Sequence, residues 1–310
     1  MIRLAALRAL GWSSLYTLVI VAAAHGVTYE PNEVGRIVLK SNRYGAYQQY
    51  VPLSAQPPKD LTVVVHGTLG KDTDGLVSSR AFIERWVSAA EEHGSIILAP
   101  AFDNENFGGT SGPGGGYRGL WGRHIGADEF VNRIVLSYSR DLPGLDGKFR
   151  LYGHSAGGQF ACRYVVRHPH RIRSAVICAP GEYAFPDPNV KWKYGMAAMS
   201  RRMRWTKGEP SKRVRVEPDP AGWKASSTLP IAVVVGARDD QPGNTIPGHP
   251  DGGRVTRARG WVRAMRTLAQ ENGLSPGVRL HVVPGVGHNS AELTPTSIRT
   301  LFSRSVQDDL

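Results

Sequence analysis

Hydrophobic and polar positions follow two patterns along the chain, one typical of strands and one of helices. Continuous apolar runs rich in β-branched residues and bounded by turn residues predict strands buried on both faces of a parallel sheet. Longer stretches with apolar residues every three or four positions predict amphipathic helices. The predicted strands are 35–40, 46–52, 61–65, 95–100, 148–152, 174–178, 230–235 and 278–283, and the predicted helices are 78–93, 127–140, 158–167, 254–272 and 291–306.

The order of these elements indicates an α/β fold. The strands 35–40 and 46–52 flank a short turn and predict a hairpin. From residue 61 onward strands and helices alternate, which favours a mostly parallel central sheet with helices on both faces. The stretch 182–229 interrupts the alternation, and we interpret it as a cap or lid inserted over the sheet. Residues 103–126 are glycine-rich and predict a long loop, which in a folded domain is often functional.

The first 24 residues have the pattern of an export signal. Arg3 and Arg8 give a positive start, Leu15–Ala24 is uncharged and mostly apolar, and Ala22–Ala24 fits a small-residue cleavage site. The apolar run, about 10 residues, is short for a bilayer span of roughly 20. We therefore expect a cleaved signal at 1–24, one folded domain over 25–310 and a secreted or periplasmic protein. An uncleaved anchor and a cytosolic first helix are the alternatives.

Composition and charge narrow the class of protein. The hydrophobic content of 41% and charged content of 21% are those of a soluble globular chain. The net charge of +12 favours anionic neighbours, and the basic residues of 182–229 offer a contact for an anionic surface, although such clusters are usually solvated. No nucleic-acid-binding motif is present, so we expect no nucleic-acid partner.

The cysteines and acidic residues do not form a recognisable metal or disulfide pattern. Two cysteines, Cys162 and Cys178, are too few for a disulfide framework. A single bridge between them and two buried thiols both remain open. Asp239, Asp240 and Asp251 lack the spacing of an EF-hand loop. We expect no metal and no cofactor.

Candidate chemistry begins at the pattern G-x-S-x-G formed by Gly153, Ser155 and Gly157. A strand, a tight turn and a helix are the context in which a nucleophilic serine is exposed, and the predicted elements 148–152 and 158–167 supply it. Glycines on either side let the strand and the helix approach each other. Because three positions match easily in a chain with 36 glycines, the interpretation depends on partner residues elsewhere.

Those partners follow the last predicted strands. Asp239 and Asp240 come after strand 230–235, and His288 comes after strand 278–283. The carboxyl ends of parallel strands share one edge of a sheet, where sites form. A serine hydroxyl needs a base, the histidine can serve as that base, and a carboxylate can orient the imidazole. The chain order Ser, Asp, His is that of an α/β-hydrolase triad.

With these residues in place, the chain resembles the α/β-hydrolase superfamily, and more narrowly its esterases and polyhydroxyalkanoate depolymerases. The resemblance implies an α/β-hydrolase fold over most of the chain, from about residue 46 to residue 290. The matching segments are Tyr50-Val51-Pro52, Val63–Gly67, Ile97–Pro100, Asp128 at the start of helix 129–136, Gly153–Gly158, Gly236–Asp239 and Gly287-His288.

The resemblance also implies residue roles. Ser155 would be the nucleophile, His288 the general base and Asp239 the acid, since the family acid commonly stands three residues after a glycine, here Gly236; Asp240 is the alternative. The oxyanion hole would use the N–H of Ala156 and that of Thr68 or Leu69. Asp128 and His66 are expected to be structural. The aromatic residues that either line a substrate cleft or belong to the core are Tyr117, Trp121, Trp192, Trp205 and Trp223.

The expected function is that of a serine hydrolase cleaving carboxylic esters through an acyl-enzyme, on a small-molecule or polymeric substrate. A peptidase or an acyltransferase with the same triad is an alternative, because one site geometry serves all three reactions. A non-catalytic binding protein on the same fold is the third possibility.

Overall fold

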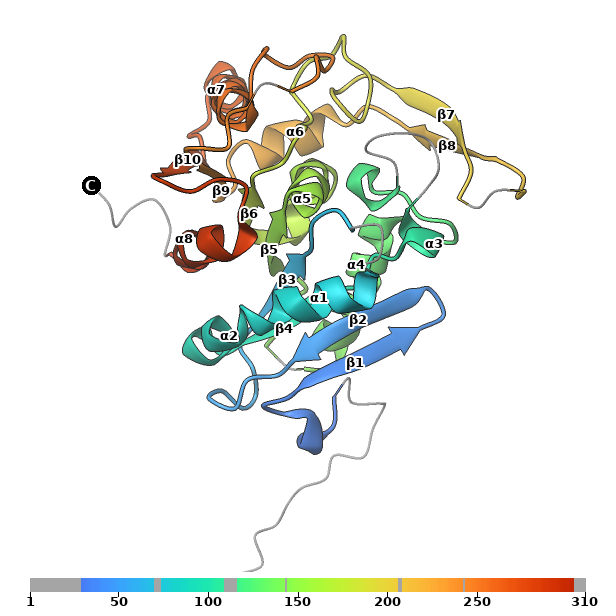
Figure 1. Cartoon of the computed structure of the whole chain (residues 1–310), viewed down its shortest axis with the longest axis vertical. Helices are drawn as coiled ribbons and strands as arrows, with labels where there is room; N and C mark the ends of the chain where they lie inside the picture. The colour runs from blue at the N-terminus through green and yellow to red at the C-terminus, as the bar shows by residue number, and fades with distance from the viewer. Residues whose placement is uncertain are drawn as a thin grey trace, which may run out of the picture.

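The centre of the protein is one eight-stranded sheet with the strand order β1-β2-β4-β3-β5-β6-β9-β10, shown in Figure 1. The computed structural model describes residues 29–69, 74–108, 116–142, 144–205, 208–241 and 243–303. The predicted export signal at 1–24 lies outside the described residues. The strands of this sheet are β1 (Ile37–Asn42), β2 (Gly45–Tyr50), β3 (Asp60–Val65), β4 (Ser95–Pro100), β5 (Phe149–His154), β6 (Ile172–Cys178), β9 (Ile231–Gly236) and β10 (Val278–Val283).

The strand directions confirm the predicted α/β class. β1 and β2 form the expected antiparallel hairpin at one edge, and β2 pairs antiparallel with β4. From β4 through β10 every pairing in the sheet is parallel. The central strands are apolar because both of their faces are covered: the side chains of Val63, Val64 and Val65 in β3 are buried. The carboxyl ends of six parallel strands therefore lie along one edge of the sheet.

Helices cover both faces of the sheet (Figure 1). α5 packs on β3, β5 and β6 from one side, and α8 packs on β5, β6 and β9 from the other. α1 and α2 share the side of α8, where the guanidinium of Arg85 donates to Ser290 Oγ at 2.7 Å. The helices are α1 (Gly75–Glu84), α2 (Val87–His93), α3 (Asn104–Phe107), α4 (Ala127–Asp141), α5 (Ala156–Arg167), α6 (Pro220–Ser226), α7 (Arg254–Glu271) and α8 (Ser290–Phe302), with short 3₁₀ turns η1 (Pro31–Glu33), η2 (Gly116–Gly119) and η3 (Pro169–Arg171).

The single helix predicted over 78–93 is wrong, because the structure has two. α1 ends at Glu84, and the next two amide groups donate to the residue three positions earlier instead of four, as in a 3₁₀ turn. Arg85 N–H donates to Phe82 O, and Trp86 N–H donates to Ile83 O. This tight turn redirects the chain and buries the Trp86 indole, whose ring centre lies 4.7 Å from that of Tyr152. The hydrophobic period is the same in both helices, so the sequence does not reveal the break.

The glycine-rich stretch 103–126 is more ordered than the predicted loop. Its described parts contain α3 and η2, and its aromatic residues Phe107, Tyr117 and Trp121 are buried in the core. Phe102 stacks on Tyr117 with ring centres 4.8 Å apart. Gly116 has a φ of +63°, and a Cβ there would meet the carbonyl oxygen of Phe107 at 1.8 Å, so only glycine permits this close approach. These aromatics support the backbone beside the site.

The segment 182–229 lies over one end of the sheet and contains a two-stranded ribbon, β7 (Met199–Met203) and β8 (Lys212–Val216), followed by α6. The ribbon register places Arg202 opposite Arg213 and Ser200 opposite Arg215, so one face is basic and exposed. Its other face packs Met203 and Val214 against the core. The indoles of Trp192, Trp205 and Trp223 are buried in the core as well.

Two further observations concern the cysteines and the membrane. Cys162 and Cys178 are free, buried thiols, and burial raises their pKa values to about 11 and about 12. The sequence left open a disulfide bridge or two buried thiols, and the structure contains two buried thiols.

In the part of the chain that the structure describes, no helix is both long and apolar enough to cross a bilayer.

Candidate active site

The candidate residues meet at the carboxyl edge of the parallel strands. Ser155 follows β5, Asp239 follows β9 and His288 follows β10. The loops after β9 and β10 are joined by backbone hydrogen bonds, including Arg238 N–H to Val286 O at 2.8 Å. Gly236 permits this approach, since a Cβ there would lie 2.4 Å from the same carbonyl oxygen. The sheet thus brings together three residues that are far apart in the sequence.

Ser155 stands on a strained turn between β5 and α5. Its backbone has φ +55° and ψ −111°, a conformation that costs a non-glycine residue about 1–3 kcal/mol. The glycines of the predicted pattern make the turn possible. A Cβ on Gly153 would lie 2.0 Å from Gly157 O, and one on Gly157 would lie 2.3 Å from Val65 O. Ser155 N–H donates to Cys178 O at 2.8 Å, which fixes the turn to β6.

A chain of two hydrogen bonds links the three side chains. Asp239 Oδ2 lies 2.6 Å from His288 Nδ1, and His288 Nε2 lies 3.0 Å from Ser155 Oγ. The Asp239 side chain is only 4% exposed whereas that of His288 is 32% exposed, so the carboxylate is shielded and the imidazole can be reached from solvent. An ionised carboxylate accepts from Nδ1–H and leaves Nε2 free to accept the serine proton. The arrangement can raise the nucleophilicity of Ser155.

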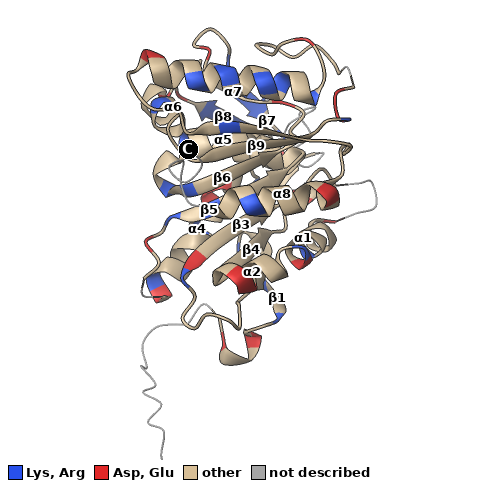
Figure 2. Cartoon of the chain, turned by 90° about the vertical axis from the view of Figure 1, so that its left-hand side faces the viewer, with Lys and Arg blue, Asp and Glu red and all other residues tan. Residues whose placement is uncertain are grey.

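The structure separates the two aspartates that the sequence left as alternatives. Asp240 does not contact His288; its carboxylate accepts from Thr256 N–H at 3.1 Å and Thr256 Oγ1 at 3.3 Å, in the first turn of α7. Asp239 also holds α7, because its Oδ1 accepts from the Arg254 guanidinium at 2.8 Å. Figure 2 shows that α7 carries several basic residues, drawn in blue. Arg254 is the first residue of this helix.

Arg254 is a residue at the site that the sequence pattern did not reveal. A basic residue in a basic helix is ordinarily solvated, and nothing in the spacing points it at Asp239, 15 positions away. The contact follows from β9 ending beside the start of α7.

The turn after β3 carries the second candidate oxyanion donor and lies against Ser155. A Cβ built on Gly67 would be 3.5 Å from Ser155 Cβ. The carbonyl oxygen of Gly67 accepts from both His66 Nδ1–H, at 2.8 Å, and the Tyr117 hydroxyl, also at 2.8 Å. Because the peptide unit is planar and trans, fixing this carbonyl also fixes the opposite direction of the Thr68 N–H. Tyr117 therefore braces the turn from within the buried core.

Three histidines other than His288 are buried or mostly buried. His66 donates to Gly67 O and accepts from Phe102 N–H at 3.2 Å, as expected for a residue that supports the turn. His249 accepts from Tyr183 N–H at 2.8 Å. The ring of His154 lies 4.8 Å from that of His288. Burial lowers the pKa values of His66 and His249 to about 4, and burial together with repulsion from His288 lowers the pKa of His154 to about 3.

Two further placements complete the comparison with the sequence. The Oδ2 atom of Asp128 lies 2.8 Å from His168 Nε2, within hydrogen-bond distance. This contact ties the start of α4 to the end of α5 and agrees with a structural role for Asp128.

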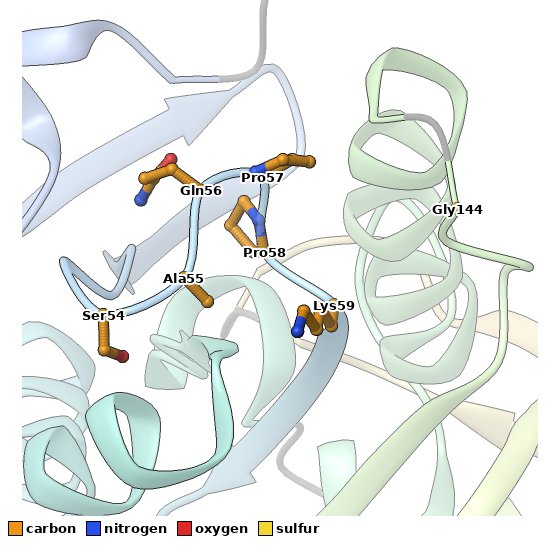
Figure 3. A pocket seen from close by; sticks show the side chains of 7 residues that line it. All are labelled: Ser54, Ala55, Gln56, Pro57, Pro58, Lys59 and Gly144. Atoms are coloured by element: carbon orange, nitrogen blue, oxygen red, sulfur yellow. The ribbon is translucent and has the colours of Figure 1, made fainter.

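A pocket of about 380 Å³ lies away from Ser155, Asp239 and His288, between the loop Ser54–Lys59 and Gly144 (Figure 3). This loop precedes β3, at the amino end of the strand, so the pocket belongs to the opposite edge of the sheet.

Known proteins resemble the chain as follows. A family model described as the alpha/beta hydrolase fold matches residues 62–216. The solved structure of a poly(3-hydroxybutyrate) depolymerase from Bordetella parapertussis aligns at 24% identity over 83% of each chain, with a TM-score of 0.64. That of poly(aspartic acid) hydrolase-1 from Sphingomonas sp. KT-1 aligns at 20% identity over 87% of this chain and 99% of that one, with a TM-score of 0.62. No curated protein sequence matches.

The family match, the parallel sheet and the turn that carries Ser155 lead to one assignment. The chain belongs to the α/β-hydrolase fold family.

Proposed function

We propose that the protein is a serine hydrolase that cleaves carboxylic esters through an acyl-enzyme on Ser155. The observation that carries the proposal is the hydrogen-bonded series from Asp239 to His288 to Ser155, 2.6 and 3.0 Å long, ending on a serine in a strained turn. In the proposed roles Ser155 is the nucleophile, His288 the general base and Asp239 the orienting acid.

In the acylation step Ser155 Oγ attacks the ester carbonyl carbon while its proton passes to His288 Nε2. The carbonyl π electrons move to oxygen and form a tetrahedral oxyanion. Asp239 stabilises the imidazolium through Nδ1–H. Collapse of the intermediate breaks the bond to the alkoxy oxygen, which takes the proton from Nε2 and leaves as the alcohol. In deacylation a water repeats these steps, giving the acid and free Ser155.

The oxyanion would be held by the N–H of Ala156, at the start of α5, and by the N–H of Thr68 or Leu69. The bracing of Gly67 by His66 and Tyr117 favours Thr68, because a donor held in place before the reaction need not reorganise during it. Loss of one such donor typically costs about 3 kcal/mol of transition-state stabilisation.

The test is hydrolysis of 4-nitrophenyl butyrate by the wild-type protein and by Ser155→Ala. We expect the variant to lose at least about a thousandfold in kcat, since the remaining donors alone give only residual catalysis. The matched control is Ser54→Ala in the distant pocket, which we expect to keep wild-type turnover. Wild-type turnover in Ser155→Ala would reject the mechanism, and labelling of Ser155 by a fluorophosphonate provides a second readout.

Two expectations from the sequence remain proposals: a polymeric as well as a small ester substrate, and export with removal of residues 1–24. The two solved relatives are named for polymer hydrolysis, but at 20% and 24% identity they share only a fold with this chain. Release of soluble acid from a polyester film would support the first, and the mature N-terminus found by mass spectrometry would decide the second. Assays with peptide and alcohol acceptors separate a peptidase or an acyltransferase.

A further inference from the structure

A group of cationic side chains lies beside the nucleophile helix and has no part in the proposed mechanism. Arg163 of α5 is fully buried, and its guanidinium donates to Lys193 O at 2.9 Å and to Arg118 O at 2.8 Å. Lys193 is also buried and lies 2.9 Å from Glu182 Oε2, which Arg163 NH2 approaches at 3.4 Å. The Glu182 carboxylate thus pairs with two cationic side chains, and Arg163 links both of them to the backbone of Arg118.

The cationic residues of this cluster interact electrostatically with one another and with Glu182. Burial and repulsion from Arg163 lower the pKa of Lys193 to about 8, so the amine is still mostly protonated near pH 7. Burial opposes ionisation of Glu182, but attraction to Lys193 and Arg163 outweighs it and lowers that pKa. Arg118 contributes to both shifts, so its charge is felt inside the cluster. The electrostatic field of these three cations in this part of the molecule therefore favours the binding of an anion.

The cluster reaches the reacting serine through Arg118. Its guanidinium donates to Thr68 Oγ1 at 3.1 Å, and Thr68 follows the Gly67 turn that lies against Ser155. The Arg118 side chain is partly exposed, and among the described residues its guanidinium donates to the Thr68 hydroxyl rather than to a carboxylate. Arg163, about two helical turns beyond Ser155 on α5, holds the backbone of Arg118 in place by donating to its carbonyl oxygen. A ligand carboxylate bound by the partly exposed Arg118 guanidinium would therefore lie beside the turn that contacts Ser155.

We propose that this cluster is a carboxylate-binding subsite, with Arg118 as its contact residue, and that the protein prefers esters carrying a free carboxylate near the scissile bond. The inference rests on the proposed ester hydrolysis and names its substrate class. The carboxylate belongs either to the acyl part, as in the half-ester of a dicarboxylic acid, or to the alcohol part, as in an acylated hydroxy acid. Arginine suits this role because its planar guanidinium binds carboxylates in a two-point geometry.

The experiment compares paired substrates that differ only in this charge. For the acyl side the pair is mono-4-nitrophenyl glutarate and its methyl ester, and for the alcohol side it is 3-(butyryloxy)butyrate and its methyl ester. We expect wild-type kcat/KM to favour the charged member of one pair by about tenfold or more, the range of a charge-assisted hydrogen bond. Arg118→Gln should remove most of this preference, and Arg118→Lys should keep part of it.

Arg36→Gln is the matched control, because it removes the same charge from an exposed position just before β1, at the edge of the sheet where the parallel strands begin. If it lowered the preference as much as Arg118→Gln, the effect would come from net charge and the subsite would be rejected. A wild-type preference for the methyl esters in both pairs would also reject it while leaving ester hydrolysis intact.

If the wild-type protein hydrolysed no member of either pair, the proposed function would fail. The subsite is then tested by calorimetric titration of glutarate into the wild-type protein and Arg118→Gln. Binding that weakens at least about tenfold in the variant supports the subsite, and the absence of binding to the wild-type protein overturns it.

Discussion

Replacement of Asp239 by asparagine tests the proposed triad most sharply, because the structure predicts in which direction the amide will turn. The carboxylate accepts on both sides, from His288 Nδ1–H through Oδ2 and from Arg254 through Oδ1. Asparagine has one acceptor oxygen and one donor NH₂ group, so it can satisfy only one of these partners. A hydrogen bond from the charged guanidinium is worth about 1.5–3 kcal/mol, against about 1 kcal/mol for one between neutral groups. The amide oxygen should therefore face Arg254.

This orientation places the asparagine NH₂ group against His288 Nδ1. Nδ1 must then accept, which moves the imidazole proton to Nε2, where it faces Ser155 and cannot accept the serine proton. The loss of the negative charge also removes the stabilisation of the imidazolium. In a serine protease the same substitution lowers kcat about 10⁴-fold through the wrong tautomer, and we expect a loss of about 10³- to 10⁴-fold here.

A double variant isolates the contribution of Arg254 as a positioning residue. In Asp239→Asn with Arg254→Gln the guanidinium no longer competes for the amide oxygen, so the amide can turn toward His288. A preference of about 1–2 kcal/mol corresponds to roughly a 5- to 30-fold recovery of kcat over Asp239→Asn alone. Arg254→Gln in the wild-type background should instead lower kcat, because the Asp239 carboxylate loses its charged hydrogen bond from Arg254 and is held only by His288.

The assay is the kcat for 4-nitrophenyl butyrate measured across pH, with the thermal midpoint of each variant recorded as a check on folding. Asp240→Asn is the matched control, since it alters only the contact with Thr256 and should cost about 1 kcal/mol of stability with kcat unchanged. The reasoning is refuted if Asp239→Asn keeps more than a tenth of wild-type kcat, or if Asp240→Asn loses more activity than Asp239→Asn.

Three further predictions concern stability and reactivity. Burial depresses the pKa values of His66, His154 and His249 to about 3 or 4, whereas a histidine in the unfolded chain has a pKa of about 6.5. Between these values the unfolded chain binds protons that the folded chain does not. The free energy of unfolding, measured with urea, should fall between pH 6.5 and 4, by up to about 1.4 kcal/mol per pH unit for each histidine; a flat profile would contradict this. Gly153→Ala should fail to fold or lose more than about 3 kcal/mol, since its Cβ would lie 2.0 Å from a carbonyl oxygen, whereas Gly287→Ala, with nothing within 4 Å, should be tolerated. Cys162 and Cys178 should not react with a thiol reagent in the native protein, and two thiols should titrate in denaturant without reductant; fewer than two would indicate a bridge.

The sequence predicts the central sheet well because its signals are local. The run 61–65 is apolar at every position except Thr62, and such a run has few alternatives to a strand covered on both faces. The two-helix break at Trp86 is not local: it depends on the packing of that indole against Tyr152, a contact that the helical period does not encode. The same holds for the stretch 103–126, where glycine content indicates turns but not the burial of Phe107 and Tyr117.

The candidate site likewise has parts that local sequence signals predict and parts that depend on tertiary packing. Strand ends place Ser155, Asp239 and His288 at one edge from sequence alone, and the structure brings them into hydrogen-bond contact. The choice of Asp239 over Asp240 and the role of Arg254 depend on where α7 starts relative to β9. The cationic cluster is equally invisible, because a buried arginine and a solvated one look the same in a sequence.

The hydrogen bond between His288 and Ser155 joins residues 133 positions apart, and β9 and β10 must both be in place before it can form. Contacts of such long range are slow to form, since the intervening chain must lose its freedom first. A partly folded chain can therefore have the turn at Ser155 complete and still lack the contact with His288. Recovery of hydrolysis during refolding should lag behind recovery of the helical circular dichroism signal. The rate at which turnover returns would then measure the rate at which β10 joins the sheet.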